Sequence, residues 1–247
     1  MIDEDEVATG EFDLPELDEE GHPVAPRVDH EWFWRLEKAI RKLAARDQFQ
    51  VERHNAHRPV PDVVRDHVQS AGGLKVSPTV GSLYDITDGF ELVWGVREGD
   101  AWVPGGQIQL FGFAEVFGSW LGRLWDVYPE GASDEAIDFT WDIRGFDGAA
   151  AGDDNMVVFH VPEILPRYHL YWHSPTRRTY RLRVDFLEYL ECLVQTCGLC
   201  GWQYMMCDRA ELEGDDEALE RVRECTRRMR ALFPDVDLSR YTTIDDA

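Results

Sequence analysis

The stretch SLYDITDGFELVWG, from Ser82 to Gly95, joins a predicted helix to a predicted strand. Its first half has the character of a helix end or a turn, whereas FELVW alternates apolar and polar residues as a half-buried strand does. Asp88 and Gly89 lie between the two halves, and an Asp-Gly pair favours a tight turn. This pair is therefore either a chemical site or the joint between a helix and a sheet.

Apolar periodicity on both sides of this joint predicts further helices and strands. Upstream, Asp29 is a suitable N-cap for a helix that begins at residue 30. Residues 58–73 predict a second helix with Pro61 near its start. Downstream, strands are expected at residues 90–96, 105–112, 156–161, 168–173 and 178–183, with a helix at 113–125 among them.

Turn-rich segments separate several of these strands. REGDAWVPGG (97–106) contains glycine, proline and aspartate, and we expect turns there. Residues 126–155 are rich in Asp, Gly and Ala. We expect a loop over this second segment, with one short element at 136–143.

Two helices are expected to follow the strands. Asp185, followed three residues later by Glu188, predicts a capping box at the start of the first. The second, over residues 214–233, places apolar side chains on one face: Ala218, Val222, Cys225, Met229 and Leu232. Helices, then strands in sequence, then helices predict an α+β domain whose mostly antiparallel central sheet is flanked by helices.

The chain is strongly acidic, with 48 Asp and Glu against 25 Lys and Arg and a net charge of −23. Residues 1–27 predict an acidic disordered tail, and residues 28–247 predict a single domain with a C-terminal helical extension. This acidity disfavours nucleic acid and anionic membranes and suits a basic protein partner, although it also serves solubility. Since neither an apolar run near 18 residues nor a secretory leader occurs, we expect a cytoplasmic protein.

Five cysteines raise the alternative of a metal site. Cys192, Cys197 and Cys200 have the C-x4-C-x2-C spacing of plant-type ferredoxins, and Cys207 follows them. Cys192 lies within a predicted helix, however, where it points about 140° away from Cys197. Cys225 occupies a core position of the last helix, as a small apolar residue would. We therefore expect core cysteines, no metal and no cofactor, and keep a Cys-ligated metal or redox protein as an alternative.

The sequence contains none of the common catalytic motifs for zinc proteases, nucleophile-elbow hydrolases, phosphate loops or dinucleotide binding. Its adjacent acidic pairs lie in predicted loops. Neighbouring exposed carboxylates titrate near their ordinary pKa values and do not divide acid and base roles. We expect a protein that is not an enzyme, and a hydrolase is the least supported alternative.

LYDITDGFELVW and GGQIQLFGFAEV, with FLEYLECLV further along the chain, resemble the SUKH superfamily. The resemblance covers approximately Pro59 to Val194, and the Gly-rich insertion from Gly145 to Asp153 departs from a compact member. The resemblance implies a binding fold without a shared catalytic apparatus. Most bacterial members are immunity proteins that neutralise a cognate toxin, often a nuclease, and a founding member is a fungal regulator of cell-wall assembly.

On this resemblance we expect an immunity protein whose acidic surface meets the basic groove of a toxin. Loops often carry binding residues. The candidate contacts are therefore the predicted loop residues Trp102, Asp126, Glu130, Asp134, Glu135, Asp153 and Asp154. In this interpretation Asp88 hydrogen-bonds the local backbone, and Gly89 supplies a positive φ at a structural turn. A regulatory scaffold of the same fold is the alternative.

Overall fold

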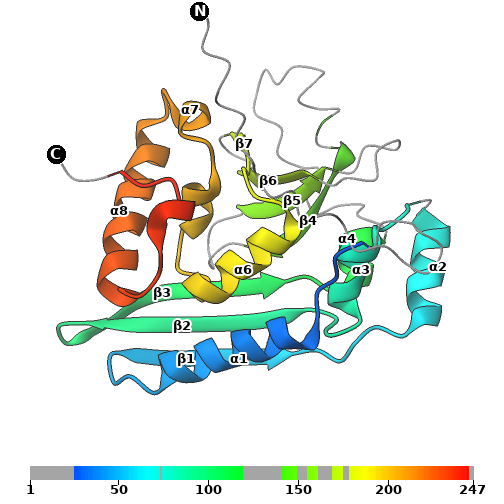
Figure 1. Ribbon diagram of the computed structural model, residues 1–247, viewed down its shortest axis with the longest axis horizontal. Coiled ribbons are helices and arrows are strands. Elements are labelled where there is room, and N and C mark those ends of the chain that lie inside the picture. The colour runs from blue at the N-terminus through cyan, green and yellow to red at the C-terminus, as the bar shows by residue number, and fades with distance from the viewer. Residues whose placement is uncertain are drawn as a thin grey trace, which may run out of the picture.

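The computed structural model describes residues 25–72, 74–118, 139, 141–148, 155–160, 169–174 and 178–244. Within these ranges, seven strands form one antiparallel sheet in sequence order (Figure 1). The strands are β1 (Phe49–Ala56), β2 (Phe90–Glu98), β3 (Ala101–Leu110), β4 (Ile143–Gly148), β5 (Met156–His160), β6 (His169–His173) and β7 (Thr179–Arg181). This confirms the predicted α+β class with an antiparallel sheet.

The helices are α1 (His30–Ala44), α2 (Asp62–Gly72), α3 (Pro78–Tyr84), α4 (Phe113–Phe117), α6 (Phe186–Thr196), α7 (Arg209–Leu212) and α8 (Asp216–Leu232). Two short 3-10 helices, η1 (Trp202–Met206) and η2 (Leu238–Arg240), follow α6 and α8. No helix in the described ranges is both long and apolar enough to cross a membrane.

Helix α1 begins where the sequence predicts. The Asp29 carboxylate accepts a hydrogen bond of 2.9 Å from the Trp32 backbone N–H and so caps the first turn. The Trp32 indole N–H donates to the Leu190 carbonyl at 3.0 Å and joins α1 to α6. The buried stripe of α1 consists of Trp32, Leu36, Ile40 and Leu43.

Helices α1, α6 and α8 lie over one face of the sheet, with α1 in front of β1 and β2 in Figure 1. Phe33 of α1 packs edge-on against Phe90 of β2, with ring centroids 6.2 Å apart. Phe233, directly after α8, packs against Trp94 of the same strand at 6.1 Å. This face of β2 is therefore part of the hydrophobic core, and Leu92 between these residues is fully buried.

Helix α6 confirms the predicted capping box. The Asp185 carboxylate accepts from the Glu188 N–H at 2.9 Å, and the Glu188 carboxylate accepts from the Asp185 N–H at 3.0 Å. In α8 the predicted apolar positions up to Met229 are buried, while Leu232 is half-buried. Pro234 follows the end of this helix.

Strand β1 was not anticipated from the sequence. Six of its eight residues are exposed, so the strand carries no clear apolar alternation. Residues 97–106, which we expected to be rich in turns, continue β2 and β3 instead. The turn is confined to Gly99 and Asp100, since the pairing runs to Glu98 and Ala101.

The expected loop at 126–155 is wrong for residues 143–148, which form β4. Two glycines weaken the strand signal there. The segment is nevertheless a strand, because Phe146 and Asp147 are fully buried in contacts with distant parts of the chain. The expected helix at 113–125 is seen as α4 up to Phe117, and residues 119–138 lie outside the described ranges.

Candidate functional site

Asp88 and Gly89 form a structural joint. The Asp88 carboxylate accepts a hydrogen bond of 2.6 Å from the Phe113 backbone N–H at the start of α4. We had expected Asp88 to bind the local backbone. The prediction is wrong on this point, because the hydrogen bond joins residues that are 25 positions apart in the sequence. Gly89 has φ +108°, which confirms the predicted positive φ, and a Cβ there would lie 3.0 Å from the Leu110 carbonyl. The pair thus holds the start of β2 against α4.

The cysteines are distributed through the core. Cys192, Cys197, Cys207 and Cys225 are buried, Cys200 is partly buried, and all five are free thiols. Burial raises the pKa of Cys197 and of Cys225 to about 12, which keeps both thiols protonated at neutral pH. Among the residues that the structure describes, no three His, Cys, Asp or Glu side chains are grouped to hold a metal ion.

The loop between α6 and η1, which contains two of these cysteines, covers an edge of the sheet. The Gln107 N–H of β3 donates to the Gly198 carbonyl at 2.7 Å. The buried Trp94 indole N–H donates to the Cys197 carbonyl, also at 2.7 Å. These bonds satisfy backbone groups of β3 and of the loop. Gly198 and Gly201 have positive φ, which gives these glycines a structural role.

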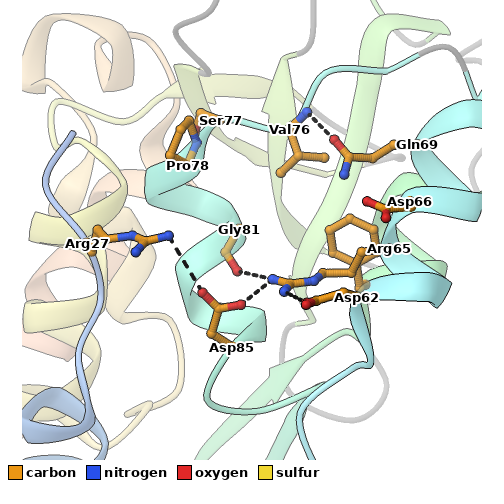
Figure 2. A pocket seen from close by; sticks show the side chains of 11 residues that line it. Arg27, Asp62, Arg65, Asp66, Gln69, Val76, Ser77, Pro78, Gly81 and Asp85 are labelled. Atoms are coloured by element: carbon orange, nitrogen blue, oxygen red, sulfur yellow. Dashed lines mark hydrogen bonds and ion pairs between the residues drawn. The ribbon is translucent and has the colours of Figure 1, made fainter. Parts of the chain in front are cut away.

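A cavity of about 380 Å³ lies between α2 and α3. Figure 2 shows Arg65 extending from α2 toward Asp85 after α3, with Arg27 on the other side of that carboxylate. Arg65 pairs with Asp85 and Asp62 and donates to the Gly81 carbonyl at 3.4 Å. Because these charges largely satisfy one another, the network acts as a clamp between the two helices.

The opposite face of β1, β2 and β3 is more open. Its residues in β2 are Glu91, Val93, Gly95 and Arg97, which alternate with the buried core residues of the same strand. Trp102 of β3 lies directly across from Arg97 and is 45% exposed. A large aromatic side chain on an open sheet face is a candidate anchor for a protein partner.

Glu52 and Gly95 lie beside Trp102. A Cβ on Gly95 would be 3.6 Å from the Glu52 Oε1 atom and 3.7 Å from the Trp102 Cε3 atom. The Val103 carbonyl is 3.2 Å from the same position, and Gly95 itself is buried, so the indole and the carboxylate pack over this glycine. The β-bulge between Val51 and Arg53 places Glu52 at this point, as bulges commonly redirect a side chain.

A further carboxylate, Asp100, lies in the adjoining turn of the β2–β3 hairpin, where Arg97 provides one positive charge, while Glu98 alternates onto the other face of β2 with Val96. The Asp100 Oδ1 atom is 4.0 Å from the Arg97 Nη2 atom. Glu52 and Glu98 have no hydrogen bond or ion pair to the part of the chain that the structure describes. We call the group Glu52, Gly95, Arg97, Asp100 and Trp102 the Trp102 patch. It combines an exposed aromatic ring with an excess of negative charge.

Of the predicted contact residues, Trp102 lies in this patch. It belongs to strand β3 and not to a loop, which corrects the expected setting. The other predicted contacts, Asp126, Glu130, Asp134, Glu135, Asp153 and Asp154, lie outside the described residues. Sequence reasoning missed Glu52 and Gly95, because their role depends on the unpredicted strand β1 and on its pairing with β2.

Comparison with protein-family models, curated proteins and solved structures finds no match to this chain.

Proposed function

We propose that this protein is a non-enzymatic immunity protein of the SUKH type, which acts in the cytoplasm by binding and neutralising a cognate toxin. The observation that supports this proposal best is the Trp102 patch, an exposed indole among carboxylates on an open sheet face. The antiparallel α+β fold and the structural role of the Asp88–Gly89 joint agree with a binding protein.

The patch supplies the two contributions that such an interface needs. Excess negative charge attracts a basic surface and raises the rate of encounter. The indole then becomes buried against the partner, and a buried tryptophan of this kind commonly contributes about 2 kcal/mol or more to binding. A basic partner, such as a nuclease whose groove binds nucleic acid, fits both requirements.

The proposal is tested by capture from the native lysate with the tagged full-length chain as bait. We expect one basic protein to be retained at low salt and released as salt rises, because screening weakens charge attraction. The captured protein is then expressed alone and together with the bait in a sensitive host. An immunity protein requires a captured partner that arrests growth when it is expressed alone and permits growth when the bait is co-expressed.

Two variants connect this assay to the patch. Trp102→Ala should lose capture and rescue, whereas Trp34→Ala, which removes another exposed tryptophan on α1, should keep both. A captured partner that is harmless when expressed alone would contradict the immunity function and favour a regulatory scaffold. If the Trp102→Ala variant still captures the partner, the interface lies outside the Trp102 patch.

A further inference from the structure

The outward face of α1 is basic and carries an exposed aromatic ring. Trp34 is 64% exposed, and the exposed residues Lys38 and Arg41 follow it at helical spacing, so the three side chains lie on one face. Lys42 lies at the edge of this face, and Glu31 lies one turn before Trp34 at its start. We call Trp34, Lys38, Arg41 and Lys42 the Trp34 face. An apolar ring among cations suits a partner that is both acidic and apolar.

The cations of the Trp34 face are available to an incoming acidic group. Lys38 and Lys42 make no hydrogen bond or ion pair within the part of the chain that the structure describes. Arg41 donates its Nε–H to a backbone carbonyl one turn back at 3.3 Å, and its side chain has no carboxylate partner among the described residues. The neighbouring Arg35, by contrast, is paired with Glu191 of α6. Three positive charges on this helix therefore remain for another segment.

We infer that the Trp34 face binds residues 11–20 of the same chain, EFDLPELDEE, which lie outside the described ranges. This segment contains six carboxylates and no basic residue, and Phe12, Leu14 and Leu17 lie among them. The apolar side chains pack on the exposed indole, and the carboxylates meet the lysines. Both halves of the Trp34 face thus find their complement in one short segment.

The segment is long enough to reach the helix. The described chain begins at Ala25, five positions before α1. Trp34 lies at most about 24 Å from Ala25, because five extended positions span about 18 Å and four helical positions add about 6 Å. The eight positions from Ala25 back to Leu17 span up to about 28 Å. Leu17 can therefore contact Trp34 while the residues before it run along α1 to Lys42.

The covalent link favours this segment over a separate acidic partner. The net charge of −23 repels another acidic protein. A segment on a short linker is present at a millimolar effective concentration, so exposed ion pairs that are weak one by one are sufficient. Helix α1 lies over the core face of the sheet, whereas Trp102 pairs with Arg97 on the other face. Binding at the Trp34 face is thus independent of the proposed function.

The first test is crosslinking of the full chain with a water-soluble carbodiimide, which joins a lysine to a carboxylate in direct contact. The chain has three lysines, Lys38, Lys42 and Lys75, so mass spectrometry assigns each crosslink to one of them. We expect Lys38 and Lys42 to be joined to carboxylates of residues 11–20. The yield should fall several-fold in high salt, because screening weakens exposed charge contacts. Mixing nitrogen-15-labelled and unlabelled chains shows whether both ends of a crosslink belong to one molecule.

The second test measures the exposure of Trp34 in the full chain labelled with 5-fluorotryptophan. Trp34→Phe identifies the fluorine NMR signal of this residue among nine tryptophans. Broadening of that signal by a neutral gadolinium chelate should increase several-fold in a variant that removes four charges of the segment: Glu16→Gln, Asp18→Asn, Glu19→Gln and Glu20→Gln. The matched control removes four charges before the segment and should leave the signal unchanged: Asp3→Asn, Glu4→Gln, Asp5→Asn and Glu6→Gln.

Three results would overturn the inference. The first is a segment that is joined to neither α1 lysine, or to Lys75 instead. The second is a Trp34 signal that responds equally in the two charge variants or in neither. The third is crosslinks that join labelled to unlabelled chains, which would assign the Trp34 face to a second copy of the protein.

Discussion

At the scale of single residues, Asp147 is the strongest example of a group whose chemistry depends on the fold. Its carboxylate is fully buried and accepts hydrogen bonds from the Tyr189 hydroxyl at 2.6 Å and from the Gln109 N–H at 3.0 Å. Burial raises the pKa of Asp147 to about 6, while those two hydrogen bonds oppose the shift. The group lies in the core and away from the Trp102 patch, so its effect is on stability.

Asp147→Asn should change the pH dependence of stability. Because the pKa of the folded state exceeds that of the unfolded chain, the protonated form favours folding, and this contribution is lost as pH rises from about 4 through 6. A shift of about two units corresponds to about 3 kcal/mol. Denaturant unfolding should therefore show that the free energy of unfolding of Asp147→Asn, taken relative to that of the wild type, rises by up to that amount between pH 4 and pH 7. A constant difference across this range would contradict the assignment.

Gly89→Ala should reduce stability without weakening recognition. The substituted residue would keep φ near +108°, and its methyl group would lie 3.0 Å from the Leu110 carbonyl. Strain of this kind costs about 1–3 kcal/mol. Urea unfolding should show a lower midpoint with an unchanged slope, and the folded fraction should bind the partner as the wild type does. Unchanged stability would exclude the structural role of the joint.

At the scale of elements, the sequence predicted the helices whose capping residue lies only a few positions from the backbone N–H group that it binds. Asp29 caps α1 over three residues, and Asp185 with Glu188 caps α6 in the same way. Strands β1 and β4 could not be predicted, because their evidence is not local. β1 is an exposed edge strand, and β4 is stabilised by the contact of Asp147 with Tyr189, 42 residues away.

Helix α2 has no buried residue and is attached by the Arg65 clamp. Arg65→Met should leave global stability within about 1 kcal/mol, because exposed ion pairs contribute little. Local opening should become easier, and amide hydrogen exchange over residues 62–72 should accelerate several-fold. Arg97→Met, which breaks an ion pair within one hairpin, is the control and should leave α2 unchanged. Unaltered exchange in Arg65→Met would show that other contacts hold the helix.

The cysteine segment gives a prediction that separates core filling from metal binding. Cys225 is 2% exposed, and its thiol contacts the Cys200 carbonyl at 3.2 Å. Cys225→Ala removes a buried side-chain atom together with its contact to the Cys200 carbonyl and should cost about 1–3 kcal/mol. Cys200→Ser, at a partly buried position, should cost less. If Cys200→Ser were the more destabilising change and released bound metal, the ligand interpretation would replace this one.

At the scale of the whole molecule, helices α1, α6 and α8 lie over one face of the sheet (Figure 1). Trp102 pairs with Arg97 on the other face of β2 and β3, so the core and the proposed interface are separate. The sequence singled out Trp102 as a candidate contact because it stands among turn residues, although the residue lies in a strand. It could not predict the patch, since Glu52 reaches Trp102 through a bulge in β1 and across Gly95 of β2. Binding should weaken as salt rises, because the patch acts partly through charge.

The most direct test of the central claim is the growth assay with the captured toxin and three forms of the full chain. Wild type and Trp34→Ala should restore growth of the sensitive host, and Trp102→Ala should fail to do so at equal protein level and equal thermal stability. Equal rescue by all three forms would contradict a toxin-binding role for the Trp102 patch.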